Sequence, residues 1–252
     1  MISIVIPIHG RRELTEKVLI HYSSFKANII CVYSEENDKI IPSRMGLHTV
    51  KFANDSLIDK FNAGFHYAKQ FNRPVAIVGS DDIISENFFI YAEKRIENGI
   101  DCVGLLDCFM VNLPTKEVYY WGGYKDEQES YLGVVSREGE SIGAGRVFST
   151  NFLEKINYSP FTALYEDRPD WCMDESNLAQ LARVGCTVEN TYLAKHGFRY
   201  WNVKSGKEIN PFDAFKIYPN FIDVSDYQFR FWEYFDSLKV ELKEKPSKKW
   251  RI

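Results

Sequence analysis

The feature that most constrains this chain is a pair of apolar strands, the second of which runs directly into two aspartates. Residues 2–8 have the β-branched composition of a buried strand, and residues 75–78 form another such run. Gly79, Ser80, Asp81 and Asp82 follow the second run at once. In an α/β sheet, ligands bind in the crevice outside the carboxyl ends of the strands, and hard divalent cations prefer carboxylate oxygens. The pattern therefore predicts a metal-assisted site for a phosphate-bearing ligand.

Strand-like and helical segments alternate through the first half of the chain. Apolar residues at Leu14, Val18, Leu19 and Tyr22 lie on one face of a helix predicted over residues 13–25. The same patterns predict strands at 28–33, 48–52 and 102–106 and helices at 55–71 and 87–98. This alternation predicts an α/β fold with a mainly parallel central sheet flanked by helices.

The second half of the chain has a different texture. Glycines and aromatic residues between positions 107 and 124 predict turns and short antiparallel strands. Helices are expected at 150–156 and 176–184, with a strand at Tyr192-Leu193. We expect a single domain over residues 1–238, followed by a basic C-terminal tail at 239–252.

Composition narrows the possible partners and the compartment. The formal net charge of -4 argues against a broad nucleic-acid footprint, although the lysine-rich tail could supply a local contact. The sequence contains no run of eighteen apolar residues and no basic region ahead of an apolar one, so a cytoplasmic protein without an integral membrane segment is expected. Five cysteines without a CxxC pair are expected to be buried reduced thiols: Cys31, Cys102, Cys108, Cys172 and Cys186.

Three segments together resemble family 2 glycosyltransferases of the GT-A fold. They are the opening strand with Pro7, the Lys60-Phe-Asn-Ala-Gly64 segment and the Gly79-Ser-Asp-Asp82 turn. The resemblance covers the first half of the chain well. It implies a Rossmann-like, nucleotide-diphospho-sugar transferase fold in which residues 1–106 bind the donor and residues 107–238 face the acceptor. A nucleotide-diphosphate sugar is the implied donor, a UDP-sugar being favoured, and the residues implied to contact it are Pro7, Glu35, Lys60, Asn62 and Asp81.

The resemblance also implies a divalent ion, Mn²⁺ or Mg²⁺, on the diphosphate of the donor. Asp82 is the expected first ligand, with Asp81 or Ser80 as its orienting neighbour and His196 as a third contact. Such an ion stabilises the charge that develops on the leaving diphosphate. The structural alternative is that Ser80 or Asp82 caps the helix expected near residue 87, and that His196 is a structural or surface histidine.

A carboxylate at the start of a later helix is the catalytic base that the resemblance implies. Asp174 and Glu175 match that position, with Asp167 and Asp170 as nearby competitors. The base would accept the proton of the acceptor hydroxyl. The alternative interpretation is that acidic residues in the first turn complement the helix dipole.

Two further sets of residues are candidates for substrate contacts. Lys204 and Lys207 flank Ser205-Gly206 in a loop that could close over the diphosphate, or they are solvated loop charges. Aromatic residues could stack on a sugar or base ring, or belong to the core: Trp121, Tyr124, Trp171, Tyr200 and Trp201.

The sequence thus predicts an enzyme, namely a metal-dependent, inverting glycosyltransferase that uses a nucleotide-diphosphate sugar. The acceptor hydroxyl is not identified, and a glycan, a protein or a modified nucleic acid are all open. One alternative is a non-catalytic nucleotide- or sugar-binding module of the same fold. Another is a nucleotidyltransferase, which would release pyrophosphate instead of a nucleoside diphosphate.

Overall fold

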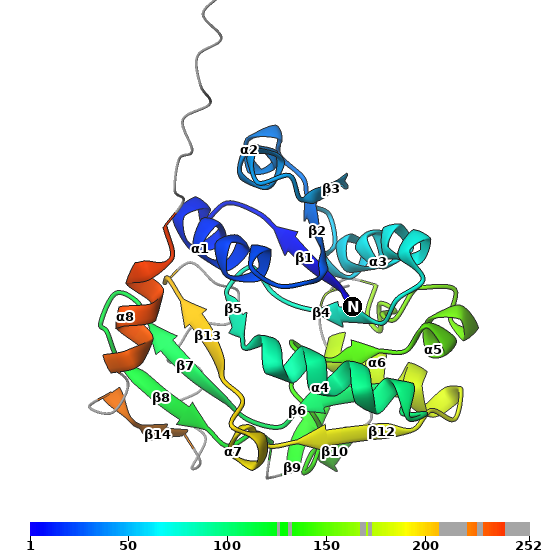
Figure 1. Cartoon of the computed structure of the whole chain (residues 1–252). Helices are drawn as coiled ribbons and strands as arrows, with labels where there is room; N and C mark the ends of the chain where they lie inside the picture. The colour runs from blue at the N-terminus through cyan, green and yellow to red at the C-terminus, as the bar shows by residue number, and fades with distance from the viewer. Residues whose placement is uncertain are drawn as a thin grey trace, which may run out of the picture.

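The computed structural model describes residues 1–124, 127–130, 133–166, 170, 173–206, 221–225 and 229–239. Within these residues, the larger of the β-sheets has seven strands, and all its neighbouring pairs are parallel except those made by β11 (Figure 1). The predicted mainly parallel central sheet is confirmed. Its strands, in spatial order, are β12 (Val188–Thr191), β6 (Cys102–Leu105), β11 (Val147–Phe148), β4 (Val75–Ile77), β1 (Ser3–Ile8), β2 (Asn28–Tyr33) and β3 (His48–Lys51).

Helices cover both faces of this sheet. Alternate side chains of its central strand β1 point to opposite faces, so both faces present apolar groups that must be covered. Ile4 and Ile6 belong to one apolar cluster, which includes residues of α1 (Arg12–Ser23) and α4 (Glu86–Glu97). Val5 belongs to a second cluster with residues of α3 (Leu57–Ala68) and α5 (Thr150–Lys155). The central strand is therefore buried along its whole length, as the sequence indicated.

Gly64 on α3 allows that helix to lie directly against β1 and β2. A Cβ at this position would lie 2.3 Å from Cγ1 of Val5 and 2.8 Å from Cγ2 of Val32. Only a residue without a side chain fits at this distance. The glycine of the Lys60–Gly64 segment thus has a packing role.

A smaller, five-stranded sheet lies beside the first. Its strands, in spatial order, are β14 (Phe221–Asp223), β8 (Val118–Trp121), β7 (Cys108–Asn112), β13 (Tyr200–Lys204) and β5 (Asp82–Ile84). The hairpin of β9 (Glu127–Ser130) and β10 (Gly133–Ser136) forms a separate pair. Helix α8 (Phe229–Ser237) packs on the five-stranded sheet, where the rings of Phe231 and Trp201 lie 5.4 Å apart. The antiparallel strands expected after residue 107 are confirmed by the pairing of β7 with β8.

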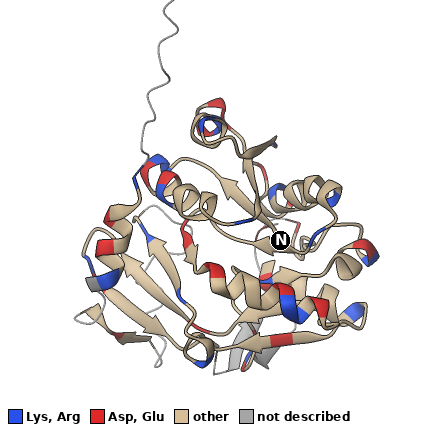
Figure 2. Cartoon of the chain, viewed as in Figure 1, with Lys and Arg blue, Asp and Glu red and all other residues tan. Residues whose placement is uncertain are grey.

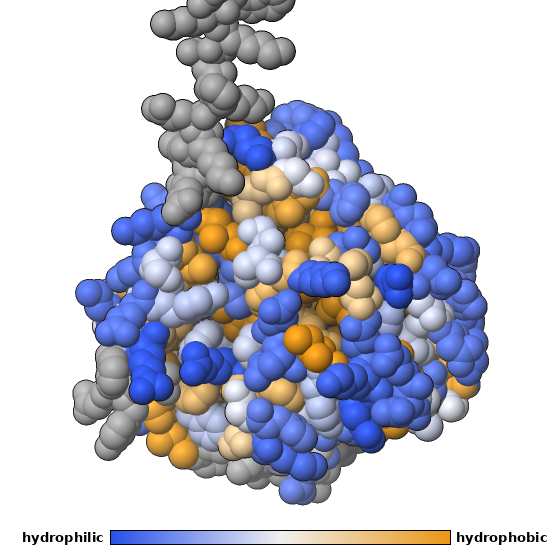
Figure 3. All heavy atoms as spheres, in the orientation of Figure 1, coloured by the Kyte–Doolittle hydropathy of each residue, from blue (hydrophilic) through white to orange (hydrophobic). Residues whose placement is uncertain are grey.

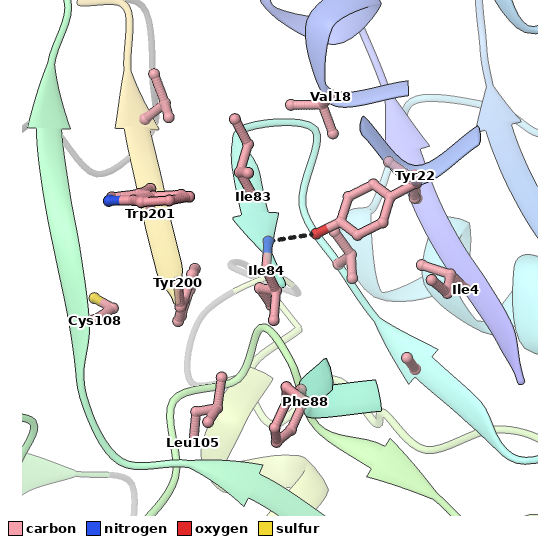
Figure 4. Close-up of a cluster of buried hydrophobic side chains, with 14 of the residues drawn as sticks. Ile4, Val18, Tyr22, Ile83, Ile84, Phe88, Leu105, Cys108, Tyr200 and Trp201 are labelled. Atoms are coloured by element: carbon pink, nitrogen blue, oxygen red, sulfur yellow. Dashed lines mark hydrogen bonds between the residues drawn. The ribbon is translucent and has the colours of Figure 1, made fainter. Parts of the chain in front are cut away.

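Tyr22 joins α1 to this second sheet through the largest apolar cluster (Figure 4). Its hydroxyl accepts a hydrogen bond of 3.0 Å from the backbone N–H of Ile84 and donates one of 3.0 Å to the carbonyl of Asp82. The short strand β5 is therefore fixed from both sides, by α1 and by β13.

The structure differs from the sequence-based prediction at several elements. Helix α2 (Glu36–Arg44) was not predicted, because it is largely polar and contains Pro42. Strand β5 starts at the second aspartate of the acidic turn, where no strand was predicted. Tyr192-Leu193 is not a strand: Tyr192 precedes the short helix α7 (Leu193–His196), and the strand in this region is β12. Helix α6 (Met173–Arg183) begins three residues earlier than predicted, and α3 is extended by the 3₁₀ turn η1 (Lys69–Phe71).

Lys and Arg positions are interspersed with Asp and Glu positions along the elements in Figure 2, and the face in Figure 3 is mainly hydrophilic with smaller apolar areas. No helix in the described residues is long and apolar enough to cross a membrane. Cys31, Cys102 and Cys108 are buried free thiols and Cys186 is a half-buried one, whereas Cys172 and residues 240–252 lie outside the described residues.

Candidate functional site

The carboxyl ends of β1, β2 and β4 meet at one edge of the larger sheet because these strands are parallel. The loop 9–11 follows β1, and the acidic turn 79–82 follows β4. Strand β11 is antiparallel to β4, with Val147 opposite Ala76, so residues 143–146 enter at the same edge. The loop 9–11, the turn 79–82 and residues 143–146 lie far apart in the sequence. They meet at the carboxyl end of β4.

Asp81 lies between two cations at this edge. Its Oδ2 accepts a hydrogen bond of 3.2 Å from Nη1 of Arg11 and lies 3.5 Å from Nζ of Lys204. Arg11 also donates from Nη2 to the hydroxyl of Ser80 at 2.7 Å. The backbone of Arg11 is in the left-handed region at φ 42°, which is uncommon for a residue with a side chain. Arg11 and Lys204 therefore bring positive charge from two different sheets to one carboxylate.

Asp82 points inward and is 2% exposed. Its Oδ1 accepts hydrogen bonds from the Tyr200 hydroxyl at 2.9 Å and from Nδ2 of Asn202 at 2.6 Å. Its Oδ2 accepts the backbone N–H of Gly79 at 2.7 Å. Burial, and then the neighbouring Asp81 charge, raise the pKa of Asp82 to about 6. Neither Ser80 nor Asp82 caps α4, whose N-cap is Ser85, so the capping alternative is wrong.

The two aspartates do present oxygens to a common point. A Cβ added to Gly79 would lie 2.6 Å from Oδ2 of Asp82 and 2.7 Å from Oδ1 of Asp81. Two carboxylate oxygens converging beside a residue without a side chain are donors of the kind that Mg²⁺ and Mn²⁺ accept. Within the described ranges no group of three or more His, Cys, Asp or Glu side chains could hold an ion.

His196 is not brought to the aspartates. It lies at the end of α7, before β13 begins, whereas Asp82 faces Asn202 further along β13. Its ring stacks on Phe198 at 5.0 Å and lies 4.6 Å from the ring of Tyr91. The expectation that His196 joins Asp82 as a metal contact is corrected, since the partners of its ring are the aromatic side chains of Tyr91 and Phe198.

Lys60 is 2% exposed and lies at the carboxyl end of β1. Its Nζ donates to the carbonyl of Ile8 at 2.8 Å and to Oδ1 of Asn54 at 3.2 Å. Burial lowers the pKa of Lys60 to about 8, although the charges of Asp38 and Glu35 oppose this shift. A buried ammonium group thus faces the space between the ends of β1 and β2.

The other residues predicted to contact the sugar donor differ in whether their side chains are free to reach a ligand. Pro7 is buried in β1 opposite Val32, whereas Glu35 is exposed at the N-cap of α2. Asn62 is used internally: its Nδ2 donates to the carbonyl of Phe161 at 3.0 Å, and its Oδ1 accepts the N–H of the same residue at 3.3 Å. Asn62 therefore anchors the segment around residue 161 to α3, and its predicted contact with a ligand is corrected to this structural role.

Asp174 lies in the first turn of α6, next to the turn 143–146. Its carboxylate occupies the space beside Gly143, where a Cβ would lie 1.9 Å from Oδ1. The same oxygen is 3.8 Å from Nη1 of the fully buried Arg146, which also donates to the Asp174 carbonyl at 3.2 Å. Because residues 143–146 lie beside the end of β4, Asp174 is placed at the same edge as Asp81. Glu175 follows it and is half-buried.

The competing acidic residues have other positions. Asp170 accepts hydrogen bonds at Oδ1 from the N–H of Ile58 at 3.0 Å and the hydroxyl of Ser56 at 3.1 Å. It therefore stabilises the N-terminus of α3 and is a poor candidate for a base. Asp167, Trp171 and Lys207 lie outside the described residues.

The structure decides between the predicted alternatives for Lys204 and for the aromatic residues that it describes. Lys204 is 6% exposed at the end of β13, so it is a buried cation and not a solvated loop charge. Tyr200 and Trp201 are 1% and 6% exposed, so they belong to the core and do not form a stacking surface. Trp121 is buried as well, and Tyr124 lies under the guanidinium of Arg137.

The sequence patterns assigned neither Arg11 nor Asp38 to the candidate site. The backbone N–H of Gly10 donates to both carboxylate oxygens of Asp38 on α2, to Oδ1 at 3.2 Å and to Oδ2 at 3.3 Å. Asp38 therefore orients the loop that carries Arg11. The available signal was a glycine followed by two arginines directly after the first strand. Asp38 gave no signal, because the helix that positions it was not predicted.

Comparison with known proteins gives a likeness of fold at low identity. No protein-family model matches the chain, and no curated protein sequence matches it. Among solved structures, the 4-diphosphocytidyl-2C-methyl-D-erythritol synthase of Anaerococcus prevotii aligns with 13% identity and a TM-score of 0.48, over 76% of this chain and 86% of that one. A protein from Bacillus anthracis described as a glucose-1-phosphate thymidylyltransferase aligns with 10% identity and a TM-score of 0.48, over 79% of this chain and 89% of that one.

Proposed function

We propose that this chain binds a nucleotide-diphosphate sugar at the edge formed by β1, β2 and β4 and transfers the sugar to an acceptor hydroxyl. The observation that carries the proposal is the convergence of Arg11, Lys204, Asp81 and Asp82 at the carboxyl end of β4. Arg11 and Lys204 are donors of the kind that bind phosphate oxygens, and a divalent ion on the two carboxylates would supply the net positive charge that a diphosphate needs.

The nucleoside end of the donor would lie toward the carboxyl ends of β1 and β2. Lys60, Glu35 and Asp38 border that space, as described above. The buried Lys60 ammonium offers a donor to a base or ribose oxygen, and the exposed Glu35 offers an acceptor to ribose hydroxyls. This assignment places the diphosphate beside Arg11 and Lys204.

The transfer itself needs charge stabilisation on one side and proton removal on the other. Arg11 and Lys204 would neutralise the diphosphate as the bond from the anomeric carbon to its oxygen breaks. A divalent ion bound by Asp81 and Asp82 would add Lewis-acid stabilisation of the same oxygens. Asp174 would accept the proton of the acceptor hydroxyl as the new glycosidic bond forms. In-line attack of this kind inverts the anomeric configuration.

The test is a panel of nucleotide sugars, each incubated with Mn²⁺, with Mg²⁺ or with a chelator. The readout is release of nucleoside diphosphate by the wild type, by Asp81→Asn and by Asp236→Asn. Asp236 is exposed on α8 and controls for the loss of one negative charge. We expect metal-dependent release from one donor, with about a 100-fold decrease in Asp81→Asn only. Full activity of Asp81→Asn would remove the acidic turn from the mechanism.

A nucleotidyltransferase is the second candidate, because two cations at one carboxylate could also neutralise a triphosphate. The two reactions release different products. Incubation with nucleoside triphosphates and sugar phosphates, with pyrophosphate as the readout, separates them. Pyrophosphate release without any nucleoside diphosphate release from sugar nucleotides would favour this second function.

A further inference from the structure

Arg137 is a buried cation with an unused hydrogen-bond donor. The residue follows strand β10 and is 8% exposed. Its Nη2 has no hydrogen-bond partner among the residues that the structure describes. A buried, charged donor without an acceptor destabilises the folded state unless a ligand or water supplies the acceptor. This atom therefore requires an explanation that the fold alone does not give.

Two neighbours hold the guanidinium of Arg137 in a fixed position. Its Cζ lies 3.7 Å from the centre of the Tyr124 ring, and its Nε donates to Oε2 of Glu140 at 2.6 Å. Burial opposes the charge, but Tyr124, Glu140 and Asp174 outweigh it, so the pKa of Arg137 is raised. A guanidinium stacked on a ring and tied at one nitrogen is pre-organised, and little side-chain entropy is lost when a ligand binds.

The position of Arg137 connects it to the candidate site. The Tyr124 ring lies 5.0 Å from that of Trp121, and Trp121 stands opposite Cys108 in the β7–β8 register. Strand β7 pairs in turn with β13, and β13 pairs with β5, whose first residue is Asp82. On its other side, the turn from Arg137 to Glu140, closed by a 3.0 Å backbone hydrogen bond, leads directly to Gly143, beside which the Asp174 carboxylate lies. Arg137 thus lies on the acceptor side, between the proposed base and the aromatic residues of β8.

We propose that Arg137 is a specificity-determining residue that binds an oxyanion, a carboxylate or a phosphate, on the acceptor. The guanidinium fork matches the paired oxygens of such a group, which a single neutral hydroxyl does not. The inference rests on the proposed function, because it places the acceptor beside Asp174. It narrows the acceptor to small molecules or glycans that carry an acidic sugar or a phosphate close to the reacting hydroxyl.

The test measures binding directly, so that it does not depend on turnover. D-glucuronate, glucose 6-phosphate and D-glucose are titrated by calorimetry into the wild type, Arg137→Gln, Arg137→Lys and Arg183→Gln. Arg183 is exposed at the end of α6, donates only to Gln180 in the described contacts, and controls for the loss of one positive charge. The glucuronate and phosphate arms identify which oxyanion is preferred.

We expect one of the two anionic sugars to bind the wild type at least about tenfold more tightly than D-glucose. Binding should weaken about tenfold or more in Arg137→Gln, recover in part in Arg137→Lys and stay unchanged in Arg183→Gln. Equal binding of glucuronate, glucose 6-phosphate and glucose to the wild type would overturn the proposal. So would unchanged anion binding in Arg137→Gln, or no anion binding to the wild type at millimolar concentration.

Thermal unfolding of each variant separates recognition from a structural role. Arg137→Gln also loses the contacts with Glu140 and Tyr124, so a lower Tm in it is compatible with either role. A lower Tm with unchanged selectivity between charged and neutral sugars assigns Arg137 to the structure alone. If anion binding depends on Arg137 but no nucleotide sugar is turned over, the recognition site stands and the proposed function fails. If a donor is turned over but anion binding ignores Arg137, only the present inference fails.

Discussion

The hydroxyl of Tyr200 donates a 2.9 Å hydrogen bond to the carboxylate of Asp82 and so ties β13 to the acidic turn. Both residues are almost completely buried. Because hydrogen bonds to charged groups contribute about 1.5–3 kcal/mol, we expect Tyr200→Phe to lower the free energy of unfolding by about 2 kcal/mol. Urea unfolding measures this change. Tyr192→Phe, at a tyrosine that is 45% exposed, serves as the control and should leave stability unchanged.

His21 makes stability depend on pH in a defined acid window. Its Nε2 donates to the carbonyl of Ile84 at 2.8 Å, and its Nδ1 accepts from the Tyr234 hydroxyl on α8. Burial lowers the pKa of His21 from 6.5 to about 4. Between these values the unfolded chain binds a proton that the folded chain does not, so stability falls as pH falls from about 6.5 to about 4.

The His21 contribution to this loss is about 3 kcal/mol, at about 1.4 kcal/mol for each pKa unit. Unfolding titrations of the wild type and His21→Gln across this window should therefore differ in slope. The variant should be less stable than the wild type at pH 7, with the gap closing toward pH 4. Parallel pH profiles would show that the pKa of His21 is the same in the folded and the unfolded protein.

Lys60 gives the same sign in the alkaline range, where stability again rises with pH. Burial lowers its pKa from 10.5 to about 8, so between these values the unfolded chain holds a proton that the folded chain has lost. Folding stability should therefore gain up to about 3 kcal/mol from this group as pH rises from about 8 to 10.5. Lys60→Met should lack this gain while remaining folded at pH 7, because an apolar side chain of similar length avoids the cost of burying a charge. Calorimetric or urea unfolding at pH 7.5 and pH 10 compares the two proteins.

Gly64 should not tolerate even one methyl group. A Cβ would lie 2.3 Å from Cγ1 of Val5, so α3 must move away from the sheet or the valines must leave their rotamers. We expect Gly64→Ala to cost about 2–3 kcal/mol despite the higher helix propensity of alanine. Ala63→Gly, the neighbouring change in the opposite direction, should cost about 1 kcal/mol through propensity alone. A Gly64→Ala protein as stable as the wild type would mean that α3 does not lie as close to β1 as described.

Asp174 should affect transfer without affecting the binding of the donor. Its carboxylate lies beside Gly143 and Arg146, whereas Arg11 and Lys204 flank Asp81. We expect Asp174→Asn to reduce sugar transfer by about 10²–10⁴-fold, the range for loss of a general base. The Kd of the donor, measured by calorimetry, should stay the same. Glu175→Gln is the matched comparison, and a larger loss of transfer in that variant would move the role of base to Glu175.

The sequence by itself determined the helices and strands that follow from local composition and from one regular spacing of apolar residues. The runs at residues 2–8 and 75–78 are apolar because strands buried on both faces need apolar side chains at every position, and they are adjacent parallel strands in the structure. The delivery of Asp81 and Asp82 to the carboxyl end of a central strand followed from the same pattern.

Only the tertiary structure decided which of these side chains face one another. Asp82 points inward because β5 pairs with β13, and its partner Asn202 is 120 positions away in the chain. The same pairing brings Lys204 to Asp81, whereas His196 stays before the start of β13. Arg11 reaches the turn because its backbone adopts a left-handed conformation that composition does not reveal. Hydrophobic periodicity reports which face of an element is buried, but contacts between distant segments depend on strand order and register, which no local pattern encodes.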